Sequence, residues 1–166
     1  MKGQTIIVAA FPQGKFIEGL IGTSAYPGTK MEIKNGVLPV GGRHTWQPYG
    51  LNAGMATNDP RLVAILTADN LQGFTPETQC IAGQRAFVYC PLPGEEMNVL
   101  LAGQAGTGSA NAFTIGERLD SQVSGTASLT GLYIQQVTSA SKADFICMEH
   151  IDEVADVAAL AWAMMQ

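Results

Sequence analysis

The residues whose types and spacing most resemble a binding site are three glycines that follow an apolar run. They lie in VLLAGQAGTGSANAF (Val99–Phe113). An apolar strand that leads into glycines is the outline of a phosphate-binding loop. A P-loop also needs a lysine to reach the terminal phosphates, and Gly103–Ser109 has none. A dinucleotide fingerprint needs a third glycine at a fixed spacing and then a helix, whereas FTIGERL follows here. The stretch therefore predicts a turn between strands.

Nucleophilic catalysis needs an activated side chain, and the chain has only two histidines that could activate one. His44 stands in GGRHTWQPYG, which is typical of an exposed loop, and His150 stands near the C-terminus. Cys147 with His150 is one conceivable nucleophile and base. On a strand, however, their spacing puts the two side chains on opposite faces. We expect no catalytic residue, and an enzyme that uses Cys147 or His150 is the weakest of three hypotheses.

Metal and disulfide chemistry have equally few candidates. Three cysteines are an odd number in no CxxC spacing, which favours a reducing compartment, although Cys80 and Cys90 could in principle meet across a hairpin. The tail carries four acids that are typical of a solvated face: Glu149, Asp152, Glu153 and Asp156. They match no known ligand spacing. The sequence thus predicts neither a metal nor a cofactor.

Composition indicates one domain with an unusual surface. The chain of 166 residues is 46% hydrophobic but only 14% charged, against the usual quarter. Either partners cover part of the surface, or alanine inflates the hydrophobic count of a small fold. The net charge is −5 and the cationic residues are scattered, so we expect no nucleic-acid partner. The apolar segments at both ends are too short for a signal peptide or a membrane span, so no membrane partner is expected.

Short apolar runs separated by glycine and proline predict the elements. Expected strands lie in 29–40, 61–70, 84–92, 97–102, 113–121, 127–139 and 144–151. Within the first range, Asn35-Gly36 between Met31 and Val37 predicts a two-residue hairpin turn. Pro93-Gly94 lies at hairpin distance between two later runs. The pattern predicts an all-β, mainly antiparallel fold, a small β-barrel or sandwich with little helix, no internal repeat and no second domain.

The two ends of the chain carry the weakest signals of regular structure. Residues 148–166 form either an alanine-rich helix, which propensity favours, or a strand, an acidic turn and a last strand VAALAWAMM. Residues 1–23 contain no clear element beyond TIIVAAF and are interpreted as an extended arm. The expected division is an N-terminal arm, 1–25, and a single β-rich domain, 26–166. Tyr26, Trp46 and Tyr49 lie in or near loops, where they either form an interface or plug barrel ends.

The order of these segments resembles the decoration, or cement, proteins of tailed-bacteriophage capsids. The resemblance is carried by YPGTKMEI (26–33), AGQRAFVYCPLPGEEMNVLLA (82–102), FTIGERLDSQVSGTAS (113–128) and ADFICMEHIDEVADVAALAWAMM (143–165). It implies a strand–turn–strand tail and a protein that binds the outer surface of an expanded head and clamps neighbouring coat subunits. The long leader, Met1–Ala25, departs from the smallest members of that family.

The resemblance implies the major capsid protein and other copies of this chain as partners, as a homotrimer or alternatively a dimer. It also implies a place on the outer surface of the virion, after synthesis in the bacterial cytoplasm. The expected interface residues come from the arm and one loop: Ile6, Ile7, Val8, Phe11, Phe16, Arg43, His44, Trp46 and Tyr49. The alternative is a ligand- or carbohydrate-binding β module in which Trp46, Tyr49 and His44 form a stacking site.

Overall fold

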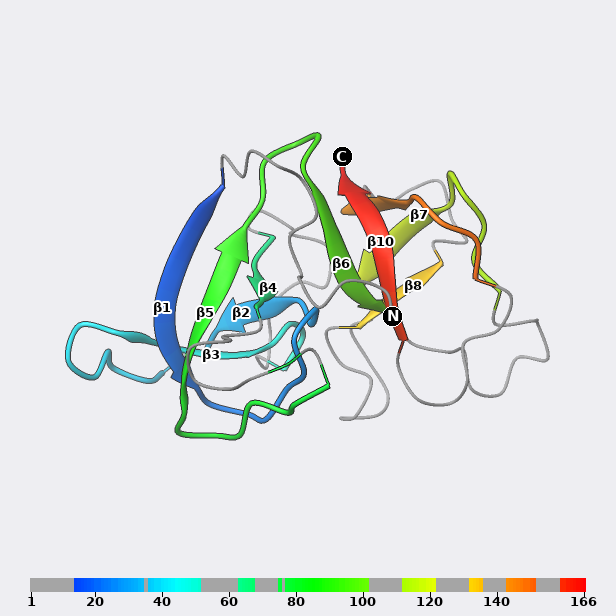
Figure 1. Ribbon diagram of the computed structural model, residues 1–166. Coiled ribbons are helices and arrows are strands. Elements are labelled where there is room, and N and C mark those ends of the chain that lie inside the picture. Colours follow the sequence, from blue (N-terminus) through cyan, green and yellow to red (C-terminus); the bar gives the residue numbers. More distant parts are fainter. Residues whose placement is uncertain are drawn as a thin grey trace.

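The computed structural model describes residues 14–34, 36–51, 63–67, 75, 77–101, 112–121, 132–135, 143–151 and 159–166. Within these residues the chain forms strands and turns and no helix, which confirms the all-β prediction (Figure 1). The first five strands are β1 (Lys15–Ile21), β2 (Met31–Ile33), β3 (His44–Pro48), β4 (Ile65–Leu66) and β5 (Arg85–Cys90). The next five are β6 (Glu96–Leu101), β7 (Arg118–Ser121), β8 (Tyr133–Gln135), β9 (Phe145–Cys147) and β10 (Ala159–Met165).

The strands form two five-stranded units. The first is a sheet in the order β2-β3-β1-β5-β4, and the second is a closed barrel in the order β10-β6-β8-β7-β9. Each unit contains one parallel pair, β1 with β3 and β6 with β8, and its other pairs are antiparallel. In Figure 1 the sheet lies on the left and the barrel on the right, and the β5–β6 turn crosses between them.

The two units share one topology. Adding five to each strand number of the sheet turns its order into β7-β8-β6-β10-β9, which is the barrel opened between β7 and β9. The barrel is closed by the β7–β9 pairing, and the sheet has a matching isolated bridge between Lys30 and Ile65. We call residues 14–90 the first repeat and residues 94–166 the second repeat. The expectation of no internal repeat is therefore wrong at the level of structure.

The correspondence extends to the register of the strands. Paired positions match in the order first repeat, then second: Phe16–Tyr89 with Glu96–Met164, Ile17–Val88 with Met97–Ala163, Ile21–Trp46 with Leu101–Tyr133, and Glu32–Gln47 with Asp120–Ile134. The same turn precedes β2 and β7, because Gly28 and Gly116 both have a φ of 90°. Gly28 N donates to Leu66 O at 2.8 Å, and Gly116 N donates to Cys147 O at the same distance. The repeats thus share a backbone pattern while their side chains have diverged.

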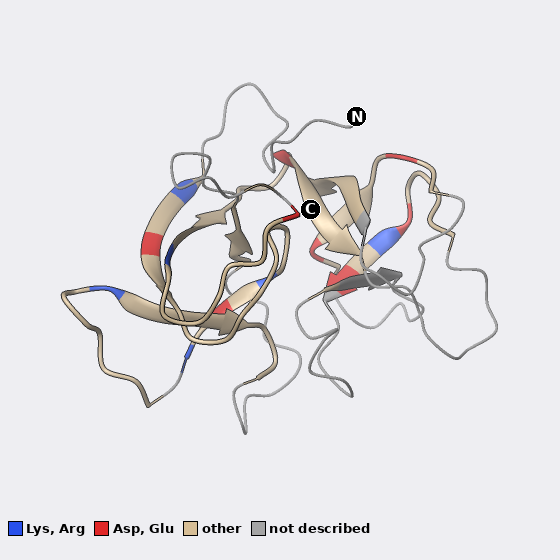
Figure 2. Cartoon of the chain, turned by 60° about the horizontal axis from the view of Figure 1, so that its bottom comes forward, with Lys and Arg blue, Asp and Glu red and all other residues tan. Residues whose placement is uncertain are grey.

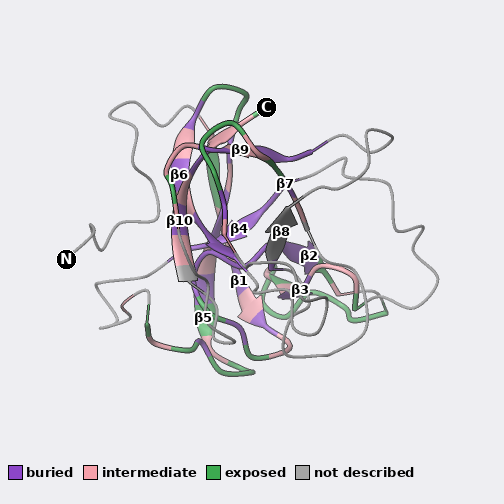
Figure 3. Cartoon of the chain, turned by 90° about the vertical axis from the view of Figure 1, so that its right-hand side faces the viewer, coloured by how far each residue is buried: buried purple, intermediate pink, exposed green. Residues whose placement is uncertain are grey.

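The two repeats pack through a shared boundary. The core of the first repeat includes Ala64 and Leu66 of the β4 segment, whereas Val63 and Ile65 belong to the core of the second. Successive side chains of a strand point to opposite faces, so this one segment serves both cores. Buried positions run along the strands and exposed ones gather in the turns (Figure 3). The two repeats are therefore held together as one folded body.

The expected arm is too long. β1 lies inside the first sheet, with β3 on one side and β5 on the other, and Ala25 is buried and bridged to Cys80. Residues 15–25 are therefore part of the fold, and the prediction of an arm over them is wrong. The reason is that KFIEGLI places Ile17, Gly19 and Ile21 on one face, a period-two pattern of strand length. Residues 1–13 lie outside the described residues.

The β-hairpin predicted across Asn35-Gly36 is also wrong. β2 pairs with β3, with Met31 opposite Pro48, so ten residues separate the two strands. The tight turn forms at Gly41-Gly42, where both glycines have positive φ and Val40 and Arg43 exchange backbone hydrogen bonds of 3.0 and 3.1 Å. Positive φ at both central positions is what such a turn requires. Pro39 lacks an N–H and cannot donate to a strand ladder.

The later strand predictions hold with one change of pairing. β9 and β10 confirm the strand interpretation of the tail over 145–147 and 159–165, while the acidic turn lies outside the described residues. Pro93-Gly94 does not close a hairpin, because β5 pairs with β1 and β4 whereas β6 pairs with β8 and β10. The turn instead carries the chain from one repeat to the next.

Candidate interaction surface

Five of the nine predicted interface residues lie in the described part of the chain. Phe16 is half-exposed on β1 with its ring centroid 4.8 Å from that of Tyr89. Arg43 and the exposed His44 stand at the start of β3. Four members lie outside the described residues: Ile6, Ile7, Val8 and Phe11.

Trp46 is not a loop residue. It lies in β3, and only 1% of its surface is exposed. The indole packs against Gly19 so closely that a Cβ at that position would overlap the ring. Among the described residues, the buried Nε1 of Trp46 has no hydrogen-bond partner. The prediction of an exposed Trp46 at an interface is therefore wrong, and its physical cause is a glycine that lies 27 positions earlier in the chain.

Tyr49 is half-buried and faces a cation from its own chain. The Lys30 Nζ lies 4.1 Å from the centroid of the Tyr49 ring. With one face of Tyr49 over an ammonium group and Trp46 inside the core, these two rings do not form a stacking platform with His44. The carbohydrate-binding site expected from these three residues is not formed.

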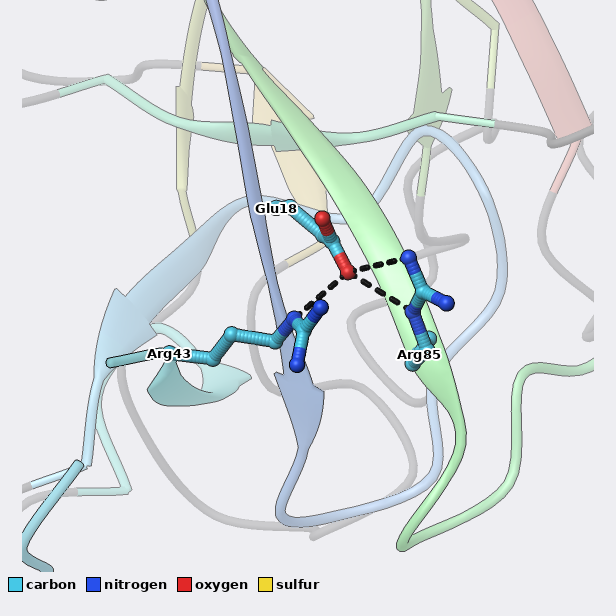
Figure 4. Close-up of polar contacts among 3 residues, drawn as sticks. All are labelled: Glu18, Arg43 and Arg85. Atoms are coloured by element: carbon cyan, nitrogen blue, oxygen red, sulfur yellow. Dashed lines mark hydrogen bonds and ion pairs between the residues drawn. The ribbon is translucent and has the colours of Figure 1, made fainter. Parts of the chain in front are cut away.

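Three charged residues from separate parts of the first sheet meet at its surface (Figure 4). Glu18 of β1 accepts from Arg43 Nε at 2.6 Å and from Arg85 Nε at 2.7 Å, all at the same oxygen, Oε1. Arg85 Nη2 lies 2.5 Å from that oxygen as well. Two guanidinium groups share one carboxylate, so the cluster carries a surplus of one positive charge.

The cluster remains open to solvent. The side chains of Arg43 and Arg85 are 39% and 55% exposed, and that of Glu18 is 28% exposed. Desolvation alone would raise the pKa of Glu18, but the hydrogen bonds and charges of Arg43 and Arg85 together lower it below its ordinary value. Glu18 therefore stays ionised at neutral pH, and each arginine keeps N–H groups that another acceptor can bind.

The last residue of β2 and the β2–β3 connection, which also carries Arg43, expose apolar side chains. Leu38 is 84% exposed, Val40 is 61% exposed, and Ile33 and Val37 are both 40% exposed. The connection projects from the first sheet as the cyan loop on the left of Figure 1. We call these four residues together with Arg43 and Arg85 the hairpin surface. Exposed apolar side chains and an arginine on one projecting connection are typical of a protein–protein contact.

The second repeat does not share the charged cluster. By strand register, Asn98 takes the place of Glu18 in the second repeat, and Leu160 takes the place of Arg85. The second repeat therefore lacks the charged cluster although it keeps the same strands. Sequence reasoning found Arg43 but missed Glu18, Arg85 and Leu38, because only the pairing of β1 with β3 and β5 brings them together.

A second feature fixes the point where the N-terminal segment enters the fold. Gly14 N donates to Tyr89 Oη at 2.9 Å and to Glu95 Oε1 at 3.0 Å. Tyr89 in turn donates to Glu95 Oε2 at 2.8 Å, and Leu92 N donates to that oxygen at 2.8 Å. Burial, and next the hydrogen bond to Glu95, raise the pKa of Tyr89 to about 12. The network ties the start of β1 to the turn between the repeats.

The described residues hold no group of three or more His, Cys, Asp or Glu side chains placed to bind a metal ion. Nor do they include a helix with the length and apolar character needed to cross a membrane. All three cysteines are described, and no disulfide joins them. No protein-family model matches the sequence, and no curated protein matches it either.

Proposed function

We propose that this protein is a decoration protein of a tailed-bacteriophage capsid, which binds the outer surface of the head and stabilises contacts between major capsid protein subunits. The observation that carries the proposal is the hairpin surface: solvent-exposed apolar side chains beside a pair of partly free arginines. Such a surface is suited to binding another protein subunit, as a protein that assembles on a shell beside other copies of itself requires, while contact with the coat protein is assigned to the leader. The sequence resemblance supplies the kind of partner.

The element proposed to reach the coat protein is the part of the leader that precedes Gly14, residues 1–13, for which the name leader is now kept. It includes four apolar residues, Ile6, Ile7, Val8 and Phe11, and it joins the fold at Gly14, which Tyr89 and Glu95 hold in place. Ordering a segment costs roughly 1–2 kcal/mol per residue in backbone entropy. Adding a strand to the edge of a coat-protein sheet offsets this cost through main-chain hydrogen bonds. The fixed entry point sets where on the shell the leader can bind.

A binding experiment on expanded heads that lack this protein tests the proposal. The full chain is expected to co-sediment with the heads, and a variant that starts at Gly14 is expected to lose binding while its circular dichroism stays unchanged. Replacing Ile6, Ile7 and Phe11 by serine should have the same effect, whereas replacing Gln4 and Thr5 by serine, the matched control, should not. Failure of the full chain to bind any such head would refute the proposed function.

A further inference from the structure

We infer that copies of this chain associate head to tail, with the hairpin surface of one copy bound to an acidic surface on the second repeat of the next. The inference rests on the proposed function, because it specifies how the subunits of the proposed oligomer contact one another. It commits to a second copy of this chain as the occupant of the hairpin surface.

The charge of the chain is strongly polarised. Residues 1–90 contain seven lysines and arginines against five acids, a net charge of +2. Residues 91–166 contain two against nine, a net charge of −7. Figure 2 shows the same asymmetry in the described part, with most blue segments on the first repeat and most red segments on the second. The first repeat of one copy is thus attracted to the second repeat of another copy, whereas two like repeats repel each other.

The hairpin surface combines exposed apolar side chains with two arginines. Leu38, at 84% exposed, is the most exposed of the large apolar residues that the structure describes. Arg43 and Arg85 share one carboxylate oxygen and stay partly open, so a carboxylate from another molecule can bind their remaining N–H groups. Arginine is among the residues that contribute most to protein interfaces, and burial of the exposed Leu38 side chain would add hydrophobic stabilisation beside the two arginines.

The acidic partner surface lies at the turn before β7. Ile115 is 68% exposed there, and Glu117 accepts a hydrogen bond from Thr114 N in the same turn. Asp120 follows on the face of β7 opposite the buried Leu119. We call Ile115, Glu117 and Asp120 the turn surface. It offers an exposed apolar residue beside two carboxylates and the exposed Arg118, which lies on the same face of β7 as Asp120. The net charge of these groups is −1, which is opposite in sign to the surplus positive charge of the Glu18, Arg43 and Arg85 cluster.

The two surfaces lie far apart on one copy. In Figure 1 the hairpin projects on the left, and the turn before β7 lies at the right-hand end. A contact between two unlike surfaces is heterologous, so it links copies into a closed ring or an open filament rather than into a dimer about a two-fold axis. The trimer that the resemblance implies is one such ring.

Molar mass by size-exclusion chromatography with light scattering tests the inference on the free protein. The natural chain is expected to form an oligomer larger than a dimer. Leu38→Asp and the double variant Arg43→Glu/Arg85→Glu are each expected to weaken the association by at least about tenfold. Leu92→Asp changes an exposed leucine in the β5–β6 turn, away from both surfaces, and serves as the matched control. A natural chain that is monomeric throughout, or a Leu38→Asp variant that stays oligomeric, would overturn the inference.

Mixing two variants tests the head-to-tail arrangement itself. Leu38→Asp lacks a working hairpin surface, and Ile115→Lys/Asp120→Lys lacks a working turn surface, so each alone is expected to be monomeric. Their mixture retains one intact contact and is expected to form a one-to-one dimer that cannot grow. A hairpin-to-hairpin contact would leave the second variant oligomeric and the mixture without a new species, which contradicts the inference. Head binding is a separate readout, so a monomer that binds heads refutes the inference alone, and an oligomer that binds no head refutes the proposed function.

Discussion

Lys30 Nζ and Asp144 Oδ2 lie 2.6 Å apart inside the protein and join the two repeats by an ion pair. Their side chains are 1% and 3% exposed. In the duplicated scaffold the place of Lys30 is taken by the exposed Arg118, and the place of Asp144 is taken by the apolar Val63. The ion pair is therefore a feature of the contact between the repeats and not of the repeated unit.

Removing one member of this pair should destabilise the whole chain. Asp144→Leu leaves a buried ammonium without its carboxylate, which typically costs about 3–5 kcal/mol. The double variant Lys30→Met/Asp144→Leu removes both charges and should recover most of that loss. Denaturant unfolding monitored by tryptophan fluorescence measures both. If the double variant were as unstable as the single one, the interaction would owe its effect to packing and not to charge.

The equivalent glycines Gly28 and Gly116 should respond differently to the same substitution. Both have a φ of 90°, so alanine at either site pays about 1–2 kcal/mol for the left-handed conformation. At Gly28 a Cβ would also lie 2.9 Å from Leu100 N and 2.8 Å from Leu160 Cδ2, whereas nothing lies within 4 Å at Gly116. Gly28→Ala is expected to lower the free energy of unfolding clearly more than Gly116→Ala. Equal losses would show that the approach of Gly28 to the second repeat is not tight.

Trp46 should tolerate phenylalanine but not alanine. Its buried Nε1 has no partner among the described residues, and an unsatisfied buried donor costs roughly 1–3 kcal/mol. Trp46→Phe removes that donor while keeping an aromatic ring beside Gly19, so its stability should stay within about 1 kcal/mol of the natural chain. Trp46→Ala should lose about 3–5 kcal/mol. Thermal unfolding compares the three proteins, and an equal loss in both variants would contradict the account.

The sequence indicates the positions of the described strands except β1 and β3, but it does not indicate which strands pair. Runs such as Arg85–Cys90 are apolar, β-branched or aromatic and end at prolines, which are local signals. The partner of a strand depends on contacts between distant residues. Thus β2 pairs beyond Gly41-Gly42 and not across Asn35-Gly36, and Trp46 is buried because Gly19 leaves it room.

Neither the structural repeat nor the hairpin surface could be predicted from the sequence, and the reason is the same for both. Between the repeats, the conserved feature at the turn before β2 and β7 is one glycine conformation, at Gly28 and Gly116, because only a positive φ restricts the residue type there. Elsewhere the repeats need only apolar residues of fitting size, which many sequences provide. The three members of the charged cluster lie 25 and 67 positions apart, so no spacing rule connects them.

Deprotonation of Tyr89 should lower the free energy of unfolding in alkaline solution. Its pKa is raised from 10.0 in the unfolded chain to about 12 in the fold, by burial and by the hydrogen bond to Glu95. The folded protein therefore holds this proton more tightly than the unfolded chain, so the stabilisation is complete below pH 10 and is lost as the pH rises towards about 12. One proton gives a slope of at most about 1.4 kcal/mol per pH unit. Denaturant unfolding between neutral pH and pH values above 10 should show this slope in the natural chain and a smaller one in Tyr89→Phe, which has no proton to lose there. Identical slopes in the two proteins would mean that burial and the hydrogen bond to Glu95 do not hold the phenol in its neutral form.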